Sequence, residues 1–588
     1  MALVLWLAVQ LGAGSAAYVV SVDARRAERP LAHFWRSTGF CPPLPHSRAD
    51  LFDLSKDQEI NLAYISSVPH GGIEQVRIHW LLELVALRMM NGKLHYNFTA
   101  LDNLMDRLWE YKLIPGFELM GNPSGYFLDF EDKEQVIRWR NLITLLARRY
   151  IDRYGLEHVA KWNFETWNEP DHHDFDNVSM TVKGFLNYYD ACSEGLRAAS
   201  PLLKFGGPGD SFHPLPKSPI CWSLLWHCYN GTNFFTGETG VRLDYISLHK
   251  KGGGSSLYIL QQEVEAVEQI QKLFPNFASV AIYNDEADPM VGWSIPQLWR
   301  ADVTYAAMVV KVIIQHQNLL FSKANNTINY TLLSNDNAFL SYYPHYFTQR
   351  TLTARFQMNN TAPPHVQMVR KPVLTVMGLL ALLGEKQVLA EVKNSEGEST
   401  ENSTIGVLAS VHTPNEMQHS DSWQATVLMY SSEDNRTSSN ISTVTVNAIH
   451  FPKLRDLVYV TYYLDNNQTN PYLKWKKLGS PDFPFPEQFQ EIRDAEVTGV
   501  RLIPLTKGQV IVFWDDGCVN SKCIKTFEVE FSPDGKAYKR INAKDTIFTL
   551  WVYSPGSSVS GFYRVRAIDY WGKGGLSSLP VEYIEAFK

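Results

Sequence analysis

The feature that most constrains the fold is an alternation of short apolar runs with longer segments of helical period, from about residue 30 to about residue 380. In one longer segment Val136, Trp139 and Ile143 recur at the spacing of a helix with one buried face. Strand then helix, repeated along one chain, predicts a parallel α/β architecture, and at this length we expect a (β/α)8 barrel over residues 31–384. A doubly wound open sheet is the alternative, although no glycine-rich phosphate turn follows the first strand. The runs expected to form strands are residues 75–80, 113–119, 162–167, 203–206, 243–248, 279–283 and 330–333.

The pattern of apolar and polar residues changes after residue 384. Short alternating runs separated by Asn-, Ser- and Glu-rich turns predict a β-sandwich over residues 385–496, which we expect residues 18–30 to join as an N-terminal strand. Residues 497–588 form a third module, whose run at 561–570 resembles the closing strands of a fibronectin type III domain. We expect this last module to serve packing or interaction, with the chemistry in the barrel.

The N-terminal residues and the glycosylation sequons predict a secreted glycoprotein. Residues 1–17 combine a short apolar run with small residues that suit a cleavage site, which predicts a signal peptide. The apolar runs fall short of the about 20 residues that a membrane span needs, so we expect no membrane span. Ten Asn-x-Ser/Thr sequons fit the secretory pathway. They are Asn97, Asn177, Asn230, Asn325, Asn329, Asn359, Asn402, Asn435, Asn440 and Asn467.

Charge and cysteine content narrow the classes of partner. The 54 Lys and Arg against 61 Asp and Glu leave a formal charge of −7, which argues against nucleic acid as a partner. The six cysteines allow few disulfides. Cys518 and Cys523 lie close enough in sequence to close a hairpin, whereas we expect Cys192 to be a buried free thiol.

Several motifs of metal, phosphate and acyl chemistry are missing from the sequence. It contains no Gly-x-Ser-x-Gly elbow, no His-Glu-x-x-His helix, no P-loop and no Cys-x-x-Cys pair. The polar run from Asp171 to Asp174 includes two adjacent histidines, but adjacent histidines rarely converge on one ion, and we interpret the run as a polar loop. We therefore expect neither a metal nor a cofactor.

Two glutamates follow predicted barrel strands. Glu169 comes after the run at residues 162–167, next to Asn168 and before Pro170, which stops the strand. Glu286 comes after the run at 279–283. Because barrel active sites lie at the C-terminal ends of the strands, we expect the two carboxyl groups to face each other across the mouth. Glycoside hydrolysis needs such a pair, an acid to protonate the leaving oxygen and a carboxylate to attack or stabilise the anomeric carbon.

These motifs belong to a resemblance that runs from about residue 30 to the C-terminus. Residues 34–43, 79–84, 163–175 and 283–288 resemble glycoside hydrolase family 39, within the clan of retaining (β/α)8 glycosidases. The resemblance implies that Glu169 is the general acid/base and Glu286 the nucleophile. It further implies substrate contacts from His79, Asn168, Lys251, Gly292, Asp336 and Arg350.

The resemblance also implies a substrate. Within the family it points to hydrolysis of terminal non-reducing α-L-iduronic acid from the glycosaminoglycans dermatan sulfate and heparan sulfate, in the lysosome. Delivery there would use a mannose-phosphate sorting receptor that binds the glycans. A uronate needs fixed cations, and Lys251 and Arg350 are the candidates. A β-xylosidase of the same family and a catalytically inactive glycan-binding protein are the alternatives.

Overall fold

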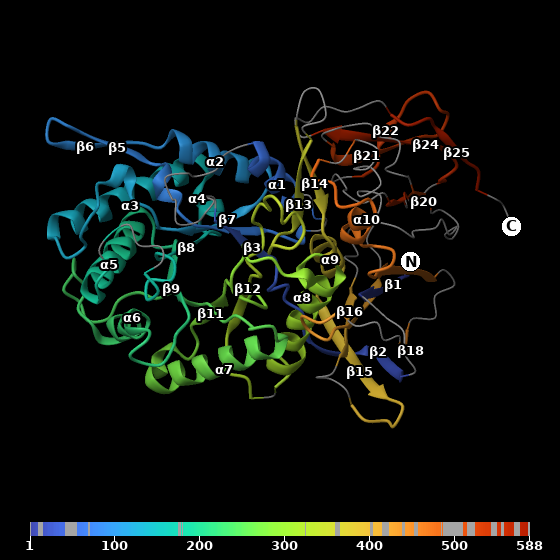
Figure 1. Ribbon diagram of the computed structural model, residues 1–588, viewed down its shortest axis with the longest axis horizontal. Helices are drawn as coiled ribbons and strands as arrows, with labels where there is room; N and C mark the ends of the chain where they lie inside the picture. The colour runs from blue at the N-terminus through green and yellow to red at the C-terminus, as the bar shows by residue number, and fades with distance from the viewer. Residues whose placement is uncertain are drawn as a thin grey trace.

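A computed structural model describes most of the chain (Figure 1). The described residues are 2–9, 16–41, 56–66, 68, 71–173, 178, 180–323, 325–358, 365–399, 404–413, 423–437, 442–451, 457–483, 485, 510–513, 524–542, 550–553, 555, 558–569 and 577–585. Cys518 and Cys523 lie outside them, as do the sequons at Asn177, Asn359, Asn402 and Asn440.

Eight parallel strands form the central sheet. In spatial order they are β3 (Ser37–Phe40), β4 (Gln75–Ile78), β7 (Ile114–Glu118), β8 (Asn163–Glu165), β9 (Lys204–Asp210), β10 (Tyr245–Leu248), β11 (Ala281–Asn284) and β12 (Tyr330–Leu333). A parallel bridge between Ser37 and Ser334 joins the last strand to the first and closes the barrel. The predicted (β/α)8 barrel is therefore confirmed. The sequence pattern predicts seven of its strands, and β3 lacks the apolar run by which the others are recognised.

Helices cover the outside of the barrel (Figure 1). α3 begins after Asp132, whose side chain accepts a hydrogen bond from the Glu134 N–H at 2.9 Å, and ends at Gly155, with a φ of 85°. Its buried face packs against α5. The helices are α1 (Lys56–Ser66), α2 (Thr99–Glu110), α3 (Lys133–Tyr154), α4 (Leu156–Val159), α5 (Val182–Ala199), α6 (Pro219–Asn230), α7 (Ser256–Leu273), α8 (Val303–Gln315) and α9 (Pro372–Leu380).

The inside of the barrel holds a charged side chain, and a glycine makes the room for it. Arg77 on β4 is 1% exposed. On the neighbouring strand β7, a Cβ at Gly116 would lie 2.9 Å from the Arg77 Cα, closer than real Cβ contacts come. Glycine therefore lets β7 approach the backbone that carries this arginine. Two hairpins extend the loops, β5 (Ala86–Met90) with β6 (Lys93–Asn97) and β13 (Thr353–Met358) with β14 (His365–Arg370).

A seven-stranded sheet lies beside the barrel, at the right of Figure 1. Its order is β18 (Ser442–Ile449), β2 (Ala16–Pro30), β15 (Lys386–Asn394), β16 (Ile405–His412), β17 (Gln424–Ser431), β1 (Ala2–Val9) and β19 (Leu457–Leu464). On β16, Leu408 joins the barrel core, whereas Val407 and Ala409 join a second core with β2 and β15. Both faces of β16 are thus buried, and the described strands of the predicted sandwich are linked by hydrogen bonds into one sheet. The short helix α10 (Pro471–Lys477) follows β19.

Strand β1 occupies part of the predicted signal peptide. It pairs in parallel with β17 on one side and with β19 on the other. Cleavage after residue 17 would remove this strand and leave β17 and β19 without their shared neighbour. The cleavage itself stays a prediction.

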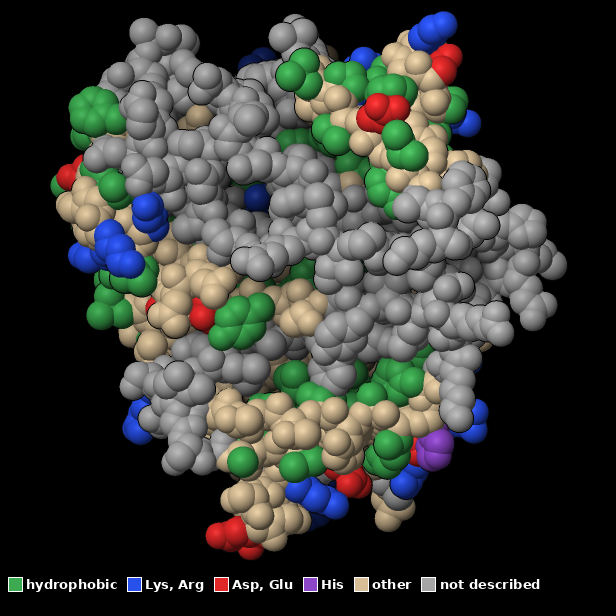
Figure 2. Space-filling view, turned by 90° about the vertical axis from the view of Figure 1, so that its right-hand side faces the viewer, with side chains coloured by type: hydrophobic (Ala, Val, Ile, Leu, Met, Phe, Trp, Pro, Cys, Tyr) green, Lys and Arg blue, Asp and Glu red, His purple; other side chains and the backbone are tan. Residues whose placement is uncertain are grey.

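Within its described residues the C-terminal module contains two small antiparallel sheets. One pairs β20 (Val510–Phe513) with β23 (Leu550–Tyr553), and the other contains β22 (Lys539–Arg540), β21 (Ile524–Ser532), β24 (Gly561–Asp569) and β25 (Val581–Tyr583). The Tyr563 hydroxyl donates to the Val559 carbonyl at 2.6 Å, a tie similar to the tyrosine corner of immunoglobulin-like domains. On the face shown in Figure 2, acidic and basic side chains of the described residues lie interspersed.

The structure describes many of the residues on which the prediction of a secreted glycoprotein depends. Asn97, Asn230, Asn325, Asn329 and Asn467 are exposed, and Asn435 is half-buried. Among the helices that the structure describes, none is long and apolar enough to span a bilayer. The cysteines at positions 41, 192, 221 and 228 are buried and free, as expected for position 192.

Trp139 anchors the packing of α3. Its ring is fully buried and meets Phe127 and Phe130 edge to face, with centroids 4.8 and 5.2 Å away. We expect Trp139→Ala to lower the free energy of unfolding by about 3–5 kcal/mol, because it leaves a cavity in a packed core. Denaturant unfolding followed by circular dichroism measures this. Leu145→Ala on the same helix is the control, since Leu145 is 47% exposed and should change stability by about 0.5 kcal/mol or less. Equal effects of the two variants would contradict the packing role.

Candidate active site

The two glutamates lie where the sequence predicts them, after β8 and β11 at the C-terminal end of the barrel. Glu169 has a φ of 42°, a left-handed conformation that residues other than glycine rarely adopt, and its N–H donates to the Gly209 carbonyl at 3.0 Å. The N–H of Ala287, next to Glu286, donates to Ser334 at 2.7 Å. Both carboxyl groups line a cavity of about 380 Å³. The backbone thus fixes both carboxylates at one mouth.

The carboxyl groups are close together. One oxygen of Glu169 and one of Glu286 lie within 4.8 Å of each other. Lys251 sits between them, with its Nζ 3.1 Å from Glu169 Oε1 and 2.6 Å from Glu286 Oε2. A retaining glycosidase holds its two carboxyl groups about 5–5.5 Å apart, whereas an inverting one needs about 6.5–9.5 Å to admit a water. The two glutamate oxygens are therefore closer than the spacing of an inverting pair.

Arg77 is the central cation beneath this pair. Its guanidinium contacts Glu118 at 2.7 Å, Glu165 at 2.8 Å and Glu286 Oε1 at 3.1 Å. It also donates to the Asn168 side-chain oxygen at 2.9 Å. A buried charge without partners would be strongly destabilising, so these carboxylates and the arginine hold one another in place.

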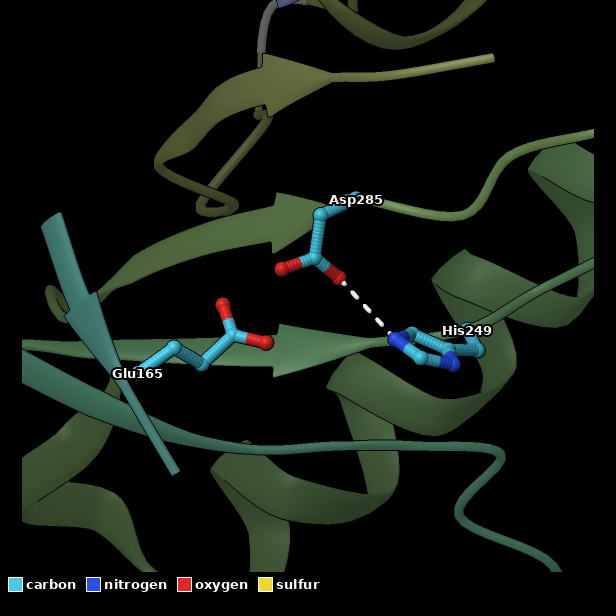
Figure 3. Close-up of side chains that lie close together, drawn as sticks. All are labelled: Glu165, His249 and Asp285. Atoms are coloured by element: carbon cyan, nitrogen blue, oxygen red, sulfur yellow. Dashed lines mark ion pairs between the residues drawn. The ribbon is translucent and has the colours of Figure 1, made fainter. Parts of the chain in front are cut away.

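His249, after β10, links the carboxylates of Glu169 and Glu286 to a deeper pair of acids. Its Nδ1 lies 2.8 Å from Glu169 Oε1, and its Nε2 lies 3.3 Å from Asp285 Oδ1. Figure 3 shows His249 and Asp285 paired, with Glu165 beside them. Burial opposes a charge on His249, but the Glu286 carboxylate and hydrogen bonds to Asp285 and Glu169 raise its pKa to about 10. The ring is therefore an imidazolium.

Opposed electrostatic effects separate the pKa values of the acids. Burial disfavours the charged form of Glu286, but His249, Lys251 and Arg77 outweigh it and hold the pKa well below its usual range. Burial likewise opposes a charge on Asp285, whose pKa Arg77 lowers to about 2. Burial prevails at Glu165, and its pKa is raised. Glu286 is thus ionised, as a nucleophile must be.

Asn168 and His79 lie beside the carboxylates as predicted. His79 follows β4, its Nδ1 lies 2.7 Å from Glu118 Oε2, and its Nε2 faces Glu286 Oε1 at 3.6 Å. The Asn168 Nδ2 is buried and has no acceptor among the described residues. Both residues can offer N–H groups to a sugar hydroxyl, and such bonds to the 2-hydroxyl strengthen in the transition state of glycosidases.

Arg350 and Asp336 form the opposite wall with the loop that carries Gly292. Arg350 Nη2 donates to Asp336 Oδ2 at 2.8 Å, and Nη1 lies 3.2 Å from Asp288. Asp288 also pairs with the buried Arg300 at 3.0 Å, whose Nη1 donates to the Gly292 carbonyl at 2.9 Å. Gly292 has a φ of 79° and lines the cavity. All eight predicted site residues therefore converge on one region.

The acidic side chains of the site pair with cationic side chains and N–H groups, which bears on whether they could bind a metal ion. Among the described residues, three groups of side chains have metal-ligand spacing, namely Glu165/His249/Asp285, Glu169/His249/Glu286 and Asp171/Asp210/Cys221. Arg77 and Lys251 already bind the acids of the first two groups. In the third, Asp171 accepts the N–H groups that begin α6, and Asp210 pairs with His172 at 3.0 Å. These residues do not fit a resident metal ion.

The sequence analysis does not identify four side chains that the structure places in the site. Arg77, Glu118, Glu165 and Asp285 are all fully or almost fully buried, and each contacts another site residue. For Arg77 the sequence does contain an indication of a special role, because this charged residue interrupts the apolar residues of a predicted strand. A charge in a buried strand indicates a partner, but the sequence does not say which one.

A closed (β/α)8 barrel that brings two carboxyl groups together at the C-terminal ends of its strands is the architecture of a glycoside hydrolase. The family model described as "Glycosyl hydrolases family 39" matches residues 18–504, and the model "Alpha-L-iduronidase C-terminal domain" matches residues 498–585. The chain belongs to glycosyl hydrolase family 39.

Relatives of known activity resemble the chain over nearly its full length. Alpha-L-iduronidase of Mus musculus is 58% identical, with 99% of this chain and 98% of that protein covered. The Homo sapiens enzyme is also 58% identical, with 97% and 94% covered. Among solved structures, the bacterial orthologue of human α-L-iduronidase gives a TM-score of 0.69 at 27% identity, covering 97% of this chain and 100% of that chain.

Asp336 makes stability depend on pH. Burial and the nearby charge of Glu286 outweigh Arg350 and raise its pKa from 3.8 to about 6. A raised pKa means that the folded state binds the proton more tightly, so the contribution of Asp336 is complete below about pH 4 and is lost as the pH rises through about 6. We expect the difference in Tm, wild type minus Asp336→Asn, to decrease from pH 4 to pH 6 in differential scanning fluorimetry. A constant or growing difference would contradict the raised pKa.

Proposed function

We propose that the chain is a retaining glycosidase that releases terminal non-reducing α-L-iduronic acid from dermatan sulfate and heparan sulfate. The observation that carries this is the pairing of two close carboxylates with two cations, Lys251 and Arg350, in one cavity. The near full-length similarity to alpha-L-iduronidases supports the choice of sugar.

The reaction proceeds by two displacements at the anomeric carbon. Glu286 attacks through an oxocarbenium-like transition state, while Glu169 gives its proton to the departing oxygen. Glu169 then removes a proton from the water that releases the sugar. Arg77 orients Glu286 through Oε1, which keeps the nucleophile ionised and in place. Asn168 and His79 bind hydroxyl groups of the sugar.

The two cations favour a uronide over a neutral sugar. A guanidinium in a fixed orientation matches a carboxylate, and Arg350 is held by Asp336 and Asp288 and lies over the Phe339 ring at 5.2 Å. A β-xylosidase, the second candidate within the family, acts on a sugar without a carboxylate. In such an enzyme the two cations would have no substrate charge to bind. An inactive glycan-binding protein would not need an ionised nucleophile beside a proton donor.

The net charge of −7 agrees with an anionic substrate of which only the end is bound. The cavity is lined by Lys251 and Arg350, whereas acidic and basic side chains are scattered over the described part of the face in Figure 2. We infer that the enzyme binds a chain terminus without wrapping a long polyanion. The signal peptide, the sequons and a mannose-phosphate sorting receptor would bring this glycoprotein to the lysosome, where acidity favours the protonated form of Glu169.

The roles of the two glutamates can be separated by substitution. We expect Glu286→Ala to reduce turnover of an aryl α-L-iduronide to a few per cent or less, because no covalent intermediate forms. Glu169→Ala should keep the first step with a good leaving group, which needs no protonation. Product analysis by NMR with added azide measures both. Glu286→Ala should give the inverted glycosyl azide and Glu169→Ala the retained one. Exchanged outcomes would reverse the assignment.

Charge recognition can be measured by comparing two substrates. We expect Lys251→Gln and Arg350→Gln to lower kcat/KM for an aryl α-L-iduronide about 10- to 100-fold, because each removes a hydrogen bond to a charged group. The aryl α-L-idoside, which carries a hydroxymethyl group in place of the carboxylate, is the control and should lose much less. Equal losses on both substrates would show that neither residue binds the carboxylate.

A further inference from the structure

Lys251 occupies the place where the reaction must happen. Its ammonium contacts Glu169 Oε1 at 3.1 Å and Glu286 Oε2 at 2.6 Å, so it lies in the gap between proton donor and nucleophile. The anomeric carbon and the leaving oxygen have to enter the same gap. The ammonium and the reacting atoms of the sugar cannot both be there.

The main chain of Lys251 is held, whereas its side chain can move. Its carbonyl accepts a hydrogen bond from Gln262 Nε2 at 2.8 Å, and the following N–H, of Gly252, donates to the Asp288 carbonyl at 3.0 Å. The four-carbon stem of a lysine is flexible, so the ammonium can change position while these main-chain contacts are kept. The cavity that Lys251 lines also contains Arg350, so a uronate bound there lies within the volume that the ammonium can reach.

The position of the ammonium determines whether Glu169 can act as an acid. Burial disfavours the Glu169 charge, but Lys251 and then His249 outweigh burial and the repulsion from Glu286, so its pKa is held far below the usual range. His172 Nδ1 lies 4.0 Å from the other carboxyl oxygen. While the ammonium remains in the gap, Glu169 is a carboxylate and has no proton to donate.

We propose that the carboxylate of the bound sugar draws the Lys251 ammonium out of the gap between Glu169 and Glu286, and that Glu169 takes up a proton as a consequence. This inference rests on the proposed function, because only a uronide supplies the attracting charge. The proton comes from solvent, and no other bond forms or breaks. A neutral sugar leaves the ammonium nearer the carboxylates, so the enzyme selects uronides in kcat as well as in binding.

Proton uptake on binding tests the proposal directly. Calorimetric titration of the wild-type protein with L-iduronate at about pH 5, in buffers of different ionisation enthalpy, gives the number of protons bound. We expect close to one proton per site. Glu169→Gln is the matched control, since it keeps the shape of the side chain and cannot be protonated, and its binding should take up no proton. Binding without uptake in the wild type, or equal uptake in both proteins, overturns the proposal.

The pH profile of turnover assigns the effect to Lys251. The pH profile of kcat reports the pKa values of the enzyme–substrate complex, and that of kcat/KM reports those of the free enzyme. In the wild type we expect the alkaline limb, where activity falls, to lie at a higher pH in the kcat profile than in the kcat/KM profile. In Lys251→Met the two limbs should coincide, because no ammonium leaves the gap on binding. Limbs as far apart in the variant as in the wild type overturn the role of Lys251. If L-iduronate does not bind and iduronides are not hydrolysed, the proposed function itself is wrong, which the other outcomes do not imply.

Discussion

The arginine inside the barrel is the interaction on which the rest of the structure depends. Arg77 is buried, and the carboxylates that surround it offset most of the cost of removing its charge from water. Those acids come from three strands, with Glu118 on β7, Glu165 on β8, and Asp285 and Glu286 directly after β11. One cation therefore links the strand order of the closed barrel to the position of Glu286. Gly116 allows this by keeping its strand free of a side chain at the point of contact.

The site is a network in which each charge sets the state of its neighbours. His249 touches both catalytic carboxylates and, at its other nitrogen, Asp285. Cations predominate around Glu286, so this carboxylate is ionised, while burial and the charge of Glu286 raise the pKa of Asp336. The network therefore shifts the pKa values of Glu286 and Asp336 in opposite directions. The same packing of charges places Lys251 where substrate binding must disturb it.

Much of the fold follows from the sequence pattern. The seven apolar runs and the helical spacing around Trp139 predict the barrel, because a continuous apolar run indicates a strand buried on both faces and a helical period indicates a helix with one buried face. The strand β3 is missed because its four residues form no such run. Glu169 and Glu286 are predicted because a polar residue after a strand faces the mouth of a barrel. Arg77, Glu118, Glu165 and Asp285 are not, because their roles consist of contacts between strands far apart in sequence.

The sequence by itself determined the class of fold, the two carboxylates and the membership of a glycosidase family, since these depend on local period and on motifs of adjacent residues. Only the tertiary structure decided the distances and the charges. That the carboxyl groups lie within 4.8 Å, that Lys251 sits between them and that His249 is an imidazolium all come from closure of the barrel. The physical reason is that electrostatic interaction depends on separation in space and on burial, and neither is a property of sequence distance.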